Sequence, residues 1–398
     1  MTESTGSVRP PTRLVIFDYG FRPFFFGAGA WAAIAVAIWL AMLSGRIESP
    51  SALDPMVWHV HEMVFGFAAA AIGGFILTAV PNWTGRAPVA GGLLAGLVAA
   101  WLAGRVAVLW SASIGAEAAA VLDLLYLAAL CAVAAREIVA GGNKRNLPIA
   151  VVIGLLGVCN LLVHLEQLGA GETAAIGNRL GIAVILLLVT VIGGRITPAF
   201  TRNWLRGHGD DADPRGPGWP DRAAIATTAL TGLSWGIAPD WPGTGVFAIA
   251  AAVAHAVRLA GWRGHRTLAE PLLSILHVGC LWLVVGFALL GASVFVAALP
   301  QSAALHALTA GAVGTMTLAV MTRASLGHSG RELRAGAGTM IVYALVTLAA
   351  LARVLSPAVA GAESDMLVLS GALWIAAFGL FAVLYAPVLL LAAPNAED

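Results

Sequence analysis

A series of apolar segments, each about 20 residues long, recurs along the whole chain and constrains its fold more than any other feature. A helix needs about 20 consecutive apolar residues to cross the hydrocarbon core of a bilayer. With 59% hydrophobic and 11% charged residues in 398, the composition also indicates a polytopic membrane protein. We expect an all-α fold in which residues 1–398 form a single membrane domain. The sequence predicts twelve spans, near residues 24–44, 60–80, 88–110, 114–135, 148–168, 176–196, 221–238, 243–260, 270–294, 303–325, 335–353 and 366–390.

The placement of the basic residues predicts how these spans are oriented. Of the 22 Lys and Arg residues, 18 fall on one predicted side of the membrane. Because cytoplasmic loops carry an excess of Lys and Arg, that side is assigned to the cytoplasm. An even number of spans then places both termini in the cytoplasm. The four exceptions are Arg46, Arg105, Arg179 and Arg353.

Two segments outside the spans are also assigned to the cytoplasm. Residues 1–22 precede the first span, and residues 197–220 connect helices six and seven. The second segment is rich in Gly, Pro and Asp, a composition that favours an irregular loop. It is too short to hold a soluble domain.

Four histidines fall at one predicted depth, near the outer face: His59, His61, His164 and His306. Ionisable residues within membrane spans are rare and tend to mark functional sites. Neutral imidazole is also a common metal and haem ligand. The alternative is that each histidine hydrogen-bonds to interfacial water or to the backbone.

His59 and His61 are two positions apart, so on a continuous helix they project about 200° from each other. Both therefore cannot face one metal ion. We expect His61 to face the bundle, on one helical face with Phe65, Ala68 and Ile72, and His59 to lie nearer the water boundary. Glu62 is predicted to orient a histidine, balance a cation or cap the start of the helix.

Charged residues at similar depths suggest two further interactions. Arg105 and Asp123, in adjacent predicted helices, are expected to form a structural ion pair, with a proton relay as the alternative. Arg46 and Arg179 lie at the depth of the histidine layer, where a guanidinium can hold a haem propionate. Otherwise these two arginines are interfacial anchors.

The other five histidines divide into two groups. His208, His265 and His328 are predicted to lie in solvated cytoplasmic loops. His277, in helix nine, and His255, in helix eight, either form a second site or are satisfied within the bundle.

A weak repeat links residues 61–86 with residues 306–331, which match in length and place His61 opposite His306. Residues 193–204 echo 73–83 more faintly. The similar helices are then the second, sixth and tenth, so the repeat predicts three arcs of four helices.

Four motifs resemble the NnrS family throughout the chain: GFRPFFFGAGAW (20–31), WHVHEMVFGFAAAAIGGFILTAVPNWTGR (58–86), GGRITPAFTRNW (193–204) and HALTAGAVGTMTLAVMTRASLGHSGR (306–331). This resemblance implies a haem- and copper-containing protein of the bacterial inner membrane. It also implies a link to denitrification and to protection against nitric oxide and nitrosative stress.

A more distant similarity is to subunit I of haem-copper oxidases, which has twelve helices in three arcs. That similarity implies that His61 is a haem axial ligand and that His306 is its partner or the axial ligand of a neighbouring haem, and the lack of a CxxCH motif makes any haem b-type. The helices that carry the oxidase copper ligands, 176–196 and 221–238 here, contain no histidine. The remaining candidates for further haem or copper ligands are His59, His164 and His277.

The leading hypothesis is therefore a haem-b membrane protein that binds or turns over nitric oxide, a small neutral ligand that needs no polar channel. An oxidoreductase would need an electron donor, which the sequence does not name. The alternative is a secondary transporter without a redox cofactor, which should show two related six-helix halves rather than a repeat of four. The lipid bilayer is an expected partner and nucleic acid is not.

Overall fold

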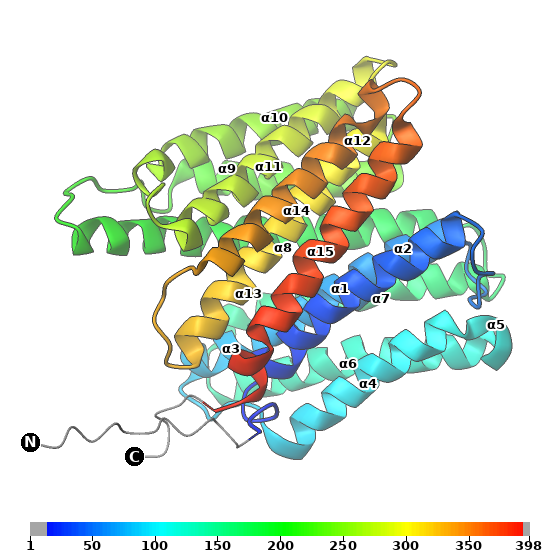
Figure 1. Cartoon of the computed structure of the whole chain (residues 1–398), viewed down its shortest axis with the longest axis horizontal. Coiled ribbons are helices and arrows are strands. Elements are labelled where there is room, and N and C mark those ends of the chain that lie inside the picture. Colours follow the sequence, from blue (N-terminus) through cyan, green and yellow to red (C-terminus); the bar gives the residue numbers. More distant parts are fainter. Residues whose placement is uncertain (1–13, 393–398) are drawn as a thin grey trace, which may run out of the picture.

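A computed structural model describes residues 14–392 as a bundle of helices that run roughly side by side (Figure 1). Apolar runs of this length form helices in a bilayer because a helix satisfies its own backbone hydrogen bonds. The α-helices that build the bundle are α1 (Phe21–Leu43), α2 (Pro55–His61), α3 (Ala69–Thr84), α4 (Gly91–Leu109), α6 (Ala116–Ala140), α7 (Leu147–Gln167), α8 (Ala174–Gly207), α9 (Trp219–Ile237), α10 (Pro242–Ala260), α11 (Pro271–Phe295), α12 (Gln301–His306), α13 (Thr315–His328), α14 (Ala337–Leu355) and α15 (Glu363–Leu390). The remaining elements are the π-helices η1 (Glu62–Ala68) and η4 (Ala307–Gly314), the short helix α5 (Ser111–Ile114), and the 3₁₀ turns η2 (Lys144–Asn146), η3 (Gly264–Arg266) and η5 (Ser356–Ala358).

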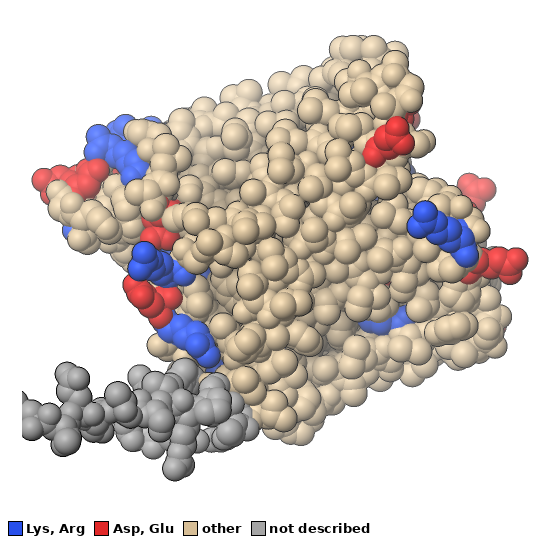
Figure 2. Space-filling view, in the orientation of Figure 1, with Lys and Arg blue, Asp and Glu red and all other residues tan. Residues whose placement is uncertain are grey.

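Eleven helices within residues 14–392 are long and apolar enough to cross a membrane. The predicted all-α, multi-pass membrane protein is therefore confirmed. The helix α9, which coincides with the predicted span 221–238, falls outside those eleven. Figure 2 shows charged side chains gathered at the two ends of the molecule, with a band almost free of them between. Such a band suits contact with lipid.

The two segments with repeated sequence are the most buried of these helices. They are α2–η1–α3, in which 78% of the most apolar stretch is buried, and α12–η4–α13, with 67%. Each continuous helix contains a π-helix that begins directly after a histidine, His61 in the first and His306 in the second. The sequence repeat thus has a structural counterpart at matching positions.

Glycines allow neighbouring groups to approach these π-helices closely. A Cβ atom at Gly66 would come within 2.7 Å of Glu62 Oε2 and 2.8 Å of Arg105 Nη1. At Gly311 it would come within 2.6 Å of the Trp282 ring. π-helical turns carry an extra residue and are frequent at functional sites.

The predicted loop at 197–220 is shorter than expected. The helix α8 continues through Pro198 to Gly207, and α9 begins at Trp219. A proline inside a membrane helix is tolerated because packed neighbours compensate for the lost hydrogen bond. The irregular segment is therefore 208–218. Of the predicted segment 1–22, residues 1–13 lie outside the described residues.

The two described chain ends meet at one end of the bundle (Figure 1). There Leu14 and Leu391 form an antiparallel bridge, and the Val15 amide donates to the Leu390 carbonyl. The loop 208–218 lies at the same end of the molecule.

Candidate functional site

A cavity lies between α1, α2–η1, α8, α12–η4, α14 and α15. Its walls are mostly apolar and aromatic side chains. The polar side chains on its walls are few: His59, His306, Thr309, Arg353 and Ser370. A large apolar cavity with a few converging polar groups is the usual form of a site for a small molecule or cofactor.

Both histidines of this cavity have a ring nitrogen available. The Nδ1 of His306 lies 2.6 Å from the Ser302 carbonyl oxygen, so Nδ1–H donates there and Nε2 carries the lone pair. His59 stacks on Trp39, with ring centroids 4.0 Å apart, and its buried Nδ1 has no hydrogen-bond partner. An imidazole fixed by one hydrogen bond, with its other nitrogen free, is arranged as a metal ligand.

Arg353 adds a positive charge to the same cavity. It makes no ion pair with a carboxylate in the described part of the chain, and it lies within electrostatic reach of both His59 and His306. Its guanidinium is therefore available to an anionic group of a bound molecule.

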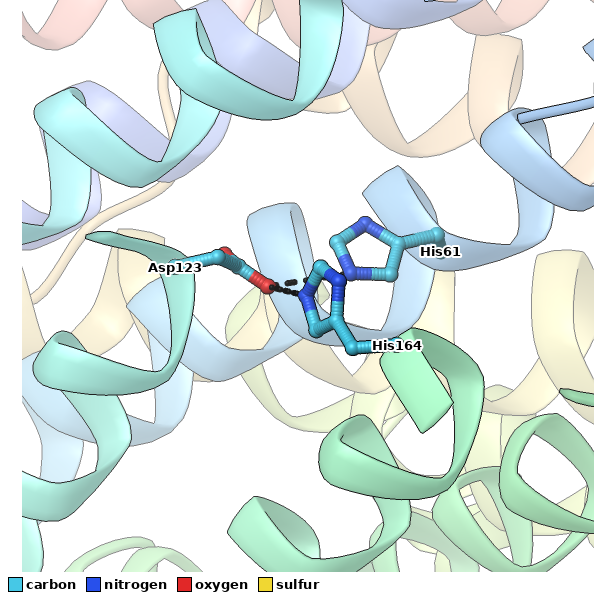
Figure 3. A group of neighbouring side chains, drawn as sticks. All are labelled: His61, Asp123 and His164. Atoms are coloured by element: carbon cyan, nitrogen blue, oxygen red, sulfur yellow. Dashed lines mark hydrogen bonds and ion pairs between the residues drawn. The ribbon is translucent and has the colours of Figure 1, made fainter. Parts of the chain in front are cut away.

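A separate polar cluster lies on the other side of the α2–η1 helix, against α4, α6 and α7. None of its six side chains is more than 2% exposed. Figure 3 shows His61 and His164 converging on Asp123, whose Oδ2 lies 3.1 Å and 2.9 Å from their Nε2 atoms. The cluster consists of His61, Glu62, Arg105, Asp123, Asn160 and His164.

Arg105 holds both carboxylates of this cluster. Its Nη1 donates to Glu62 Oε2 at 2.7 Å, and its Nη2 donates to Asp123 Oδ1. Trp31 Nε1 also donates to Glu62 Oε2 at 2.7 Å. The predicted ion pair of Arg105 with Asp123 is thus confirmed. Tyr126, one turn from Asp123, donates to the Ala69 carbonyl.

The structure does not bring His61 and His306 together as expected. His59 lines the cavity with His306, whereas His61 lies with His164 in the buried cluster. The predicted opposition of His59 and His61 on the helix is correct. His59 is half-buried and His61 fully buried, so His59 is the more exposed of the two, as predicted, although its ring lines the cavity.

The face predicted for His61 changes within η1. Phe65 stays beside it, with ring centroids 5.2 Å apart, but Ala68 and Ile72 line cavities. The π-helical turn inserts a residue and rotates the positions that follow it. A continuous α-helix could not show this shift.

Glu62 has the position of an orienting acid, since its Oε1 accepts from His61 Nδ1 at 3.0 Å. The two arginines predicted to hold propionates lie elsewhere. Arg46 is exposed in the turn after α1, and Arg179 donates to the Gly236 carbonyl at 3.1–3.2 Å. Arg353 lines the cavity instead. The sequence pointed to Arg353 only by placing it among the four basic residues on the outer side.

The remaining histidines lie apart from both sites. His277 Nε2 lies 3.0 Å from Thr201 Oγ1, and His255 contacts Thr228 and Arg258. His255 is thus satisfied within the bundle, whereas the buried Nδ1 of His277 has no hydrogen-bond partner. His328, expected in a loop, is the last residue of α13 and stacks near Tyr19.

A second cavity adjoins the first. Both are lined by Ala68, Ile185 and Val313. Apart from Thr317, the second cavity is walled by glycine and apolar side chains of α1, η1–α3, α8 and η4–α13.

The match to known proteins covers nearly the same residues as the helical bundle. A family model described as "NnrS protein" matches residues 15–392, nearly the whole chain. A search of curated proteins finds no match.

Proposed function

The chain belongs to the NnrS family, and from this premise we propose that it is a haem-b protein that binds or turns over nitric oxide. In this proposal it lies in the bacterial inner membrane and protects against nitrosative stress in denitrification-related metabolism. The observation that carries the haem assignment is the pair of histidines with available ring nitrogens in one apolar cavity.

The residues of the cavity fit a haem. His306 offers Nε2, because Ser302 holds its Nδ1, and His59 is held flat against Trp39. Arg353 is placed to pair with a propionate. The mostly apolar walls suit a porphyrin face, and no CxxCH motif offers covalent attachment. When bound, the haem would supply an iron centre able to take nitric oxide.

We propose His306 and His59, rather than His306 and His61, as the ligand pair. The cavity is not lined by His61, and both of its ring nitrogens already face polar partners. If only one histidine binds the iron, the open position suits nitric oxide, whereas ligation by both suits electron transfer.

We also infer that α9 crosses the membrane as a twelfth span. It packs against both α8 and α10, and the described chain ends lie at one end of the bundle. That arrangement requires an even number of crossings. The excess of basic residues at this end supports a cytoplasmic location for both termini.

The test is a visible spectrum of the purified protein after expression with adequate haem. We expect a Soret band that shifts when nitric oxide is added. His306→Ala should lose most of the haem, and Arg353→Gln should lower its retention. His208→Ala, at the exposed end of α8, is the matched control and should retain it. A wild-type protein without a Soret band, or full retention in both His306→Ala and His59→Ala, would refute the haem site.

The transporter alternative gains no support from the bundle. The two segments that share the α–π–α pattern are the second and tenth crossings. Two related six-helix halves would instead pair the second crossing with the eighth.

A further inference from the structure

The buried cluster around His61 has an unbalanced charge. Its carboxylates, Glu62 and Asp123, share a single guanidinium, that of Arg105. With both histidines neutral, one negative charge is left over in a site that is almost completely shielded from solvent. A buried charge without a partner is strongly unfavourable. The cluster therefore requires one further positive charge.

The hydrogen bonds show where that charge belongs. Arg105 donates to one oxygen of each carboxylate, Glu62 Oε2 and Asp123 Oδ1. The other oxygens, Glu62 Oε1 and Asp123 Oδ2, face the histidines. Because Glu62 Oε1 accepts from His61 Nδ1, a neutral His61 has its lone pair on Nε2. That nitrogen lies 3.1 Å from Asp123 Oδ2 and 2.9 Å from Asn160 Oδ1, which are both acceptors.

His164 points a nitrogen at the same place. Its Nε2 lies 2.9 Å from Asp123 Oδ2, and its buried Nδ1 has no partner. The ligand atoms of His61, Asp123 and His164 all lie within 4.8 Å of one another. A proton on His61 Nε2, with His164 donating from Nε2–H, would pair these atoms two at a time, whereas a metal ion would bind all three atoms in one site.

We propose that His61 Nε2, His164 Nε2 and Asp123 Oδ2 bind one first-row transition-metal ion. Two imidazoles and a carboxylate suit zinc, iron or copper. Glu62 would orient His61 through Nδ1, as outer carboxylates do for metal-bound histidines. The ion would join α2, α6 and α7 and remove the leftover negative charge; Cu⁺ would bring the cluster to neutrality, and a divalent ion would leave it with one positive charge. This site is independent of the haem proposal, because it lies across the α2–η1 helix from the cavity.

The experiment begins with the metal content of the full-length protein purified in detergent, with haem iron counted separately from its spectrum. We expect about one non-haem metal ion per chain. After removal of that ion by a chelator, Co²⁺ added alone should bind and give the visible absorption bands of a nitrogen- and oxygen-ligated site.

Variants then locate the ion. His164→Gln and Asp123→Asn should each lose the metal, and Glu62→Gln should weaken Co²⁺ affinity by about 10- to 100-fold. His306→Ala, on the cavity side, is the matched control: it should keep the metal and lose haem. Because ligand variants can fail to fold, X-ray absorption of the wild-type metal should independently report about two imidazole ligands.

Two results would overturn the proposal. One is a wild-type protein that holds only traces of non-haem metal and, with its Soret band intact, takes up neither Co²⁺, Zn²⁺ nor copper. The other is a full metal content in folded His164→Gln and Asp123→Asn proteins. Either result would assign the missing charge to a proton and would leave the haem proposal unaffected.

Discussion

At the scale of single residues, two histidines only two positions apart belong to different environments. His59 faces an apolar cavity with an unpartnered nitrogen, and His61 is enclosed by carboxylates. Both belong to one short helix, α2, but their ring nitrogens have different roles. A cavity nitrogen is free for a ligand, whereas a cluster nitrogen balances charge.

Substitution of each histidine should therefore have a different effect. His61→Ala removes one partner from each of two buried carboxylates, so we expect a loss of stability of about 3–5 kcal/mol. His59→Ala removes a ring from a cavity wall and should mainly reduce haem retention. Thermal unfolding and the Soret absorbance of each variant separate the two effects. Equal loss of stability in both variants would contradict the division into two sites.

At the scale of elements, the two π-helices place wide helical turns beside the two sites. The helix η4 borders the cavity, and η1 borders both the cavity and the buried cluster. In η1 the turn lets Gly66 lie against Glu62 and Arg105. The apolar sequence predicts a helix here but not the extra residue in its turn. After Glu62 the segment is apolar on every side, so its pattern does not distinguish an α-helical turn from a π-helical one. The rotation after His61 was for this reason beyond sequence reasoning.

Gly66→Ala tests how tightly η1 is fitted to the cluster. The new methyl group would meet Glu62 Oε2, Arg105 Nη1 and Trp31 Nε1 at 2.7–2.8 Å. We expect a loss of stability of about 1–3 kcal/mol from overpacking. The matched control is Gly92→Ala in α4, where a Cβ meets no atom within 4 Å. There alanine should be neutral or stabilise by up to about 1 kcal/mol, as thermal unfolding can measure.

The loop 208–218 should loosen in acid. A hydrogen bond from the Ala212 amide, and the Arg266 guanidinium, hold the pKa of Asp210 below its usual value. The Arg202 side chain similarly lowers the pKa of Asp213. A lowered pKa means that these contacts act at neutral pH and are lost as the pH falls through the folded-state values.

Amide exchange of residues 208–218, corrected for intrinsic rates, measures this loosening. Exchange should be slow at pH 7 and faster near pH 3. Asp210→Asn should exchange faster than wild type already at pH 7, because the amide keeps no charge for Arg266. A loop whose protection is the same at both pH values would contradict the role of these carboxylates.

At the scale of the whole molecule, the sequence predicted most of the fold and less of the site. Apart from the end of α8, every predicted span overlaps a helix to within a few residues at each end, since the bilayer dictates the length of apolar runs. Which face of α2 is functional could not be predicted, because His59 lines a cavity on one face and His61 joins a polar cluster on the other. The choice of Arg353 over Arg46 and Arg179 depends on helix rotation, which depth alone does not give.

The number of crossings can be tested with single cysteines at exposed positions. Asp211→Cys lies in the loop before α9, and Asp240→Cys lies between α9 and α10. If α9 spans the membrane, a maleimide that cannot cross it should label cysteine 240 from outside and cysteine 211 only after permeabilisation. Labelling of both positions from the same side would show that α9 does not cross.

The shared wall of the two cavities has a consequence for the kinetics of ligand entry. Ala68, Ile185 and Val313 line both spaces, and Thr317 is the only polar side chain of the second. An anion such as nitrite would lose its hydration there without compensation, whereas nitric oxide would partition in from the bilayer. Nitric oxide that enters from the lipid by this route would not be steered by charges on the protein. Its rate of entry would therefore be insensitive to ionic strength.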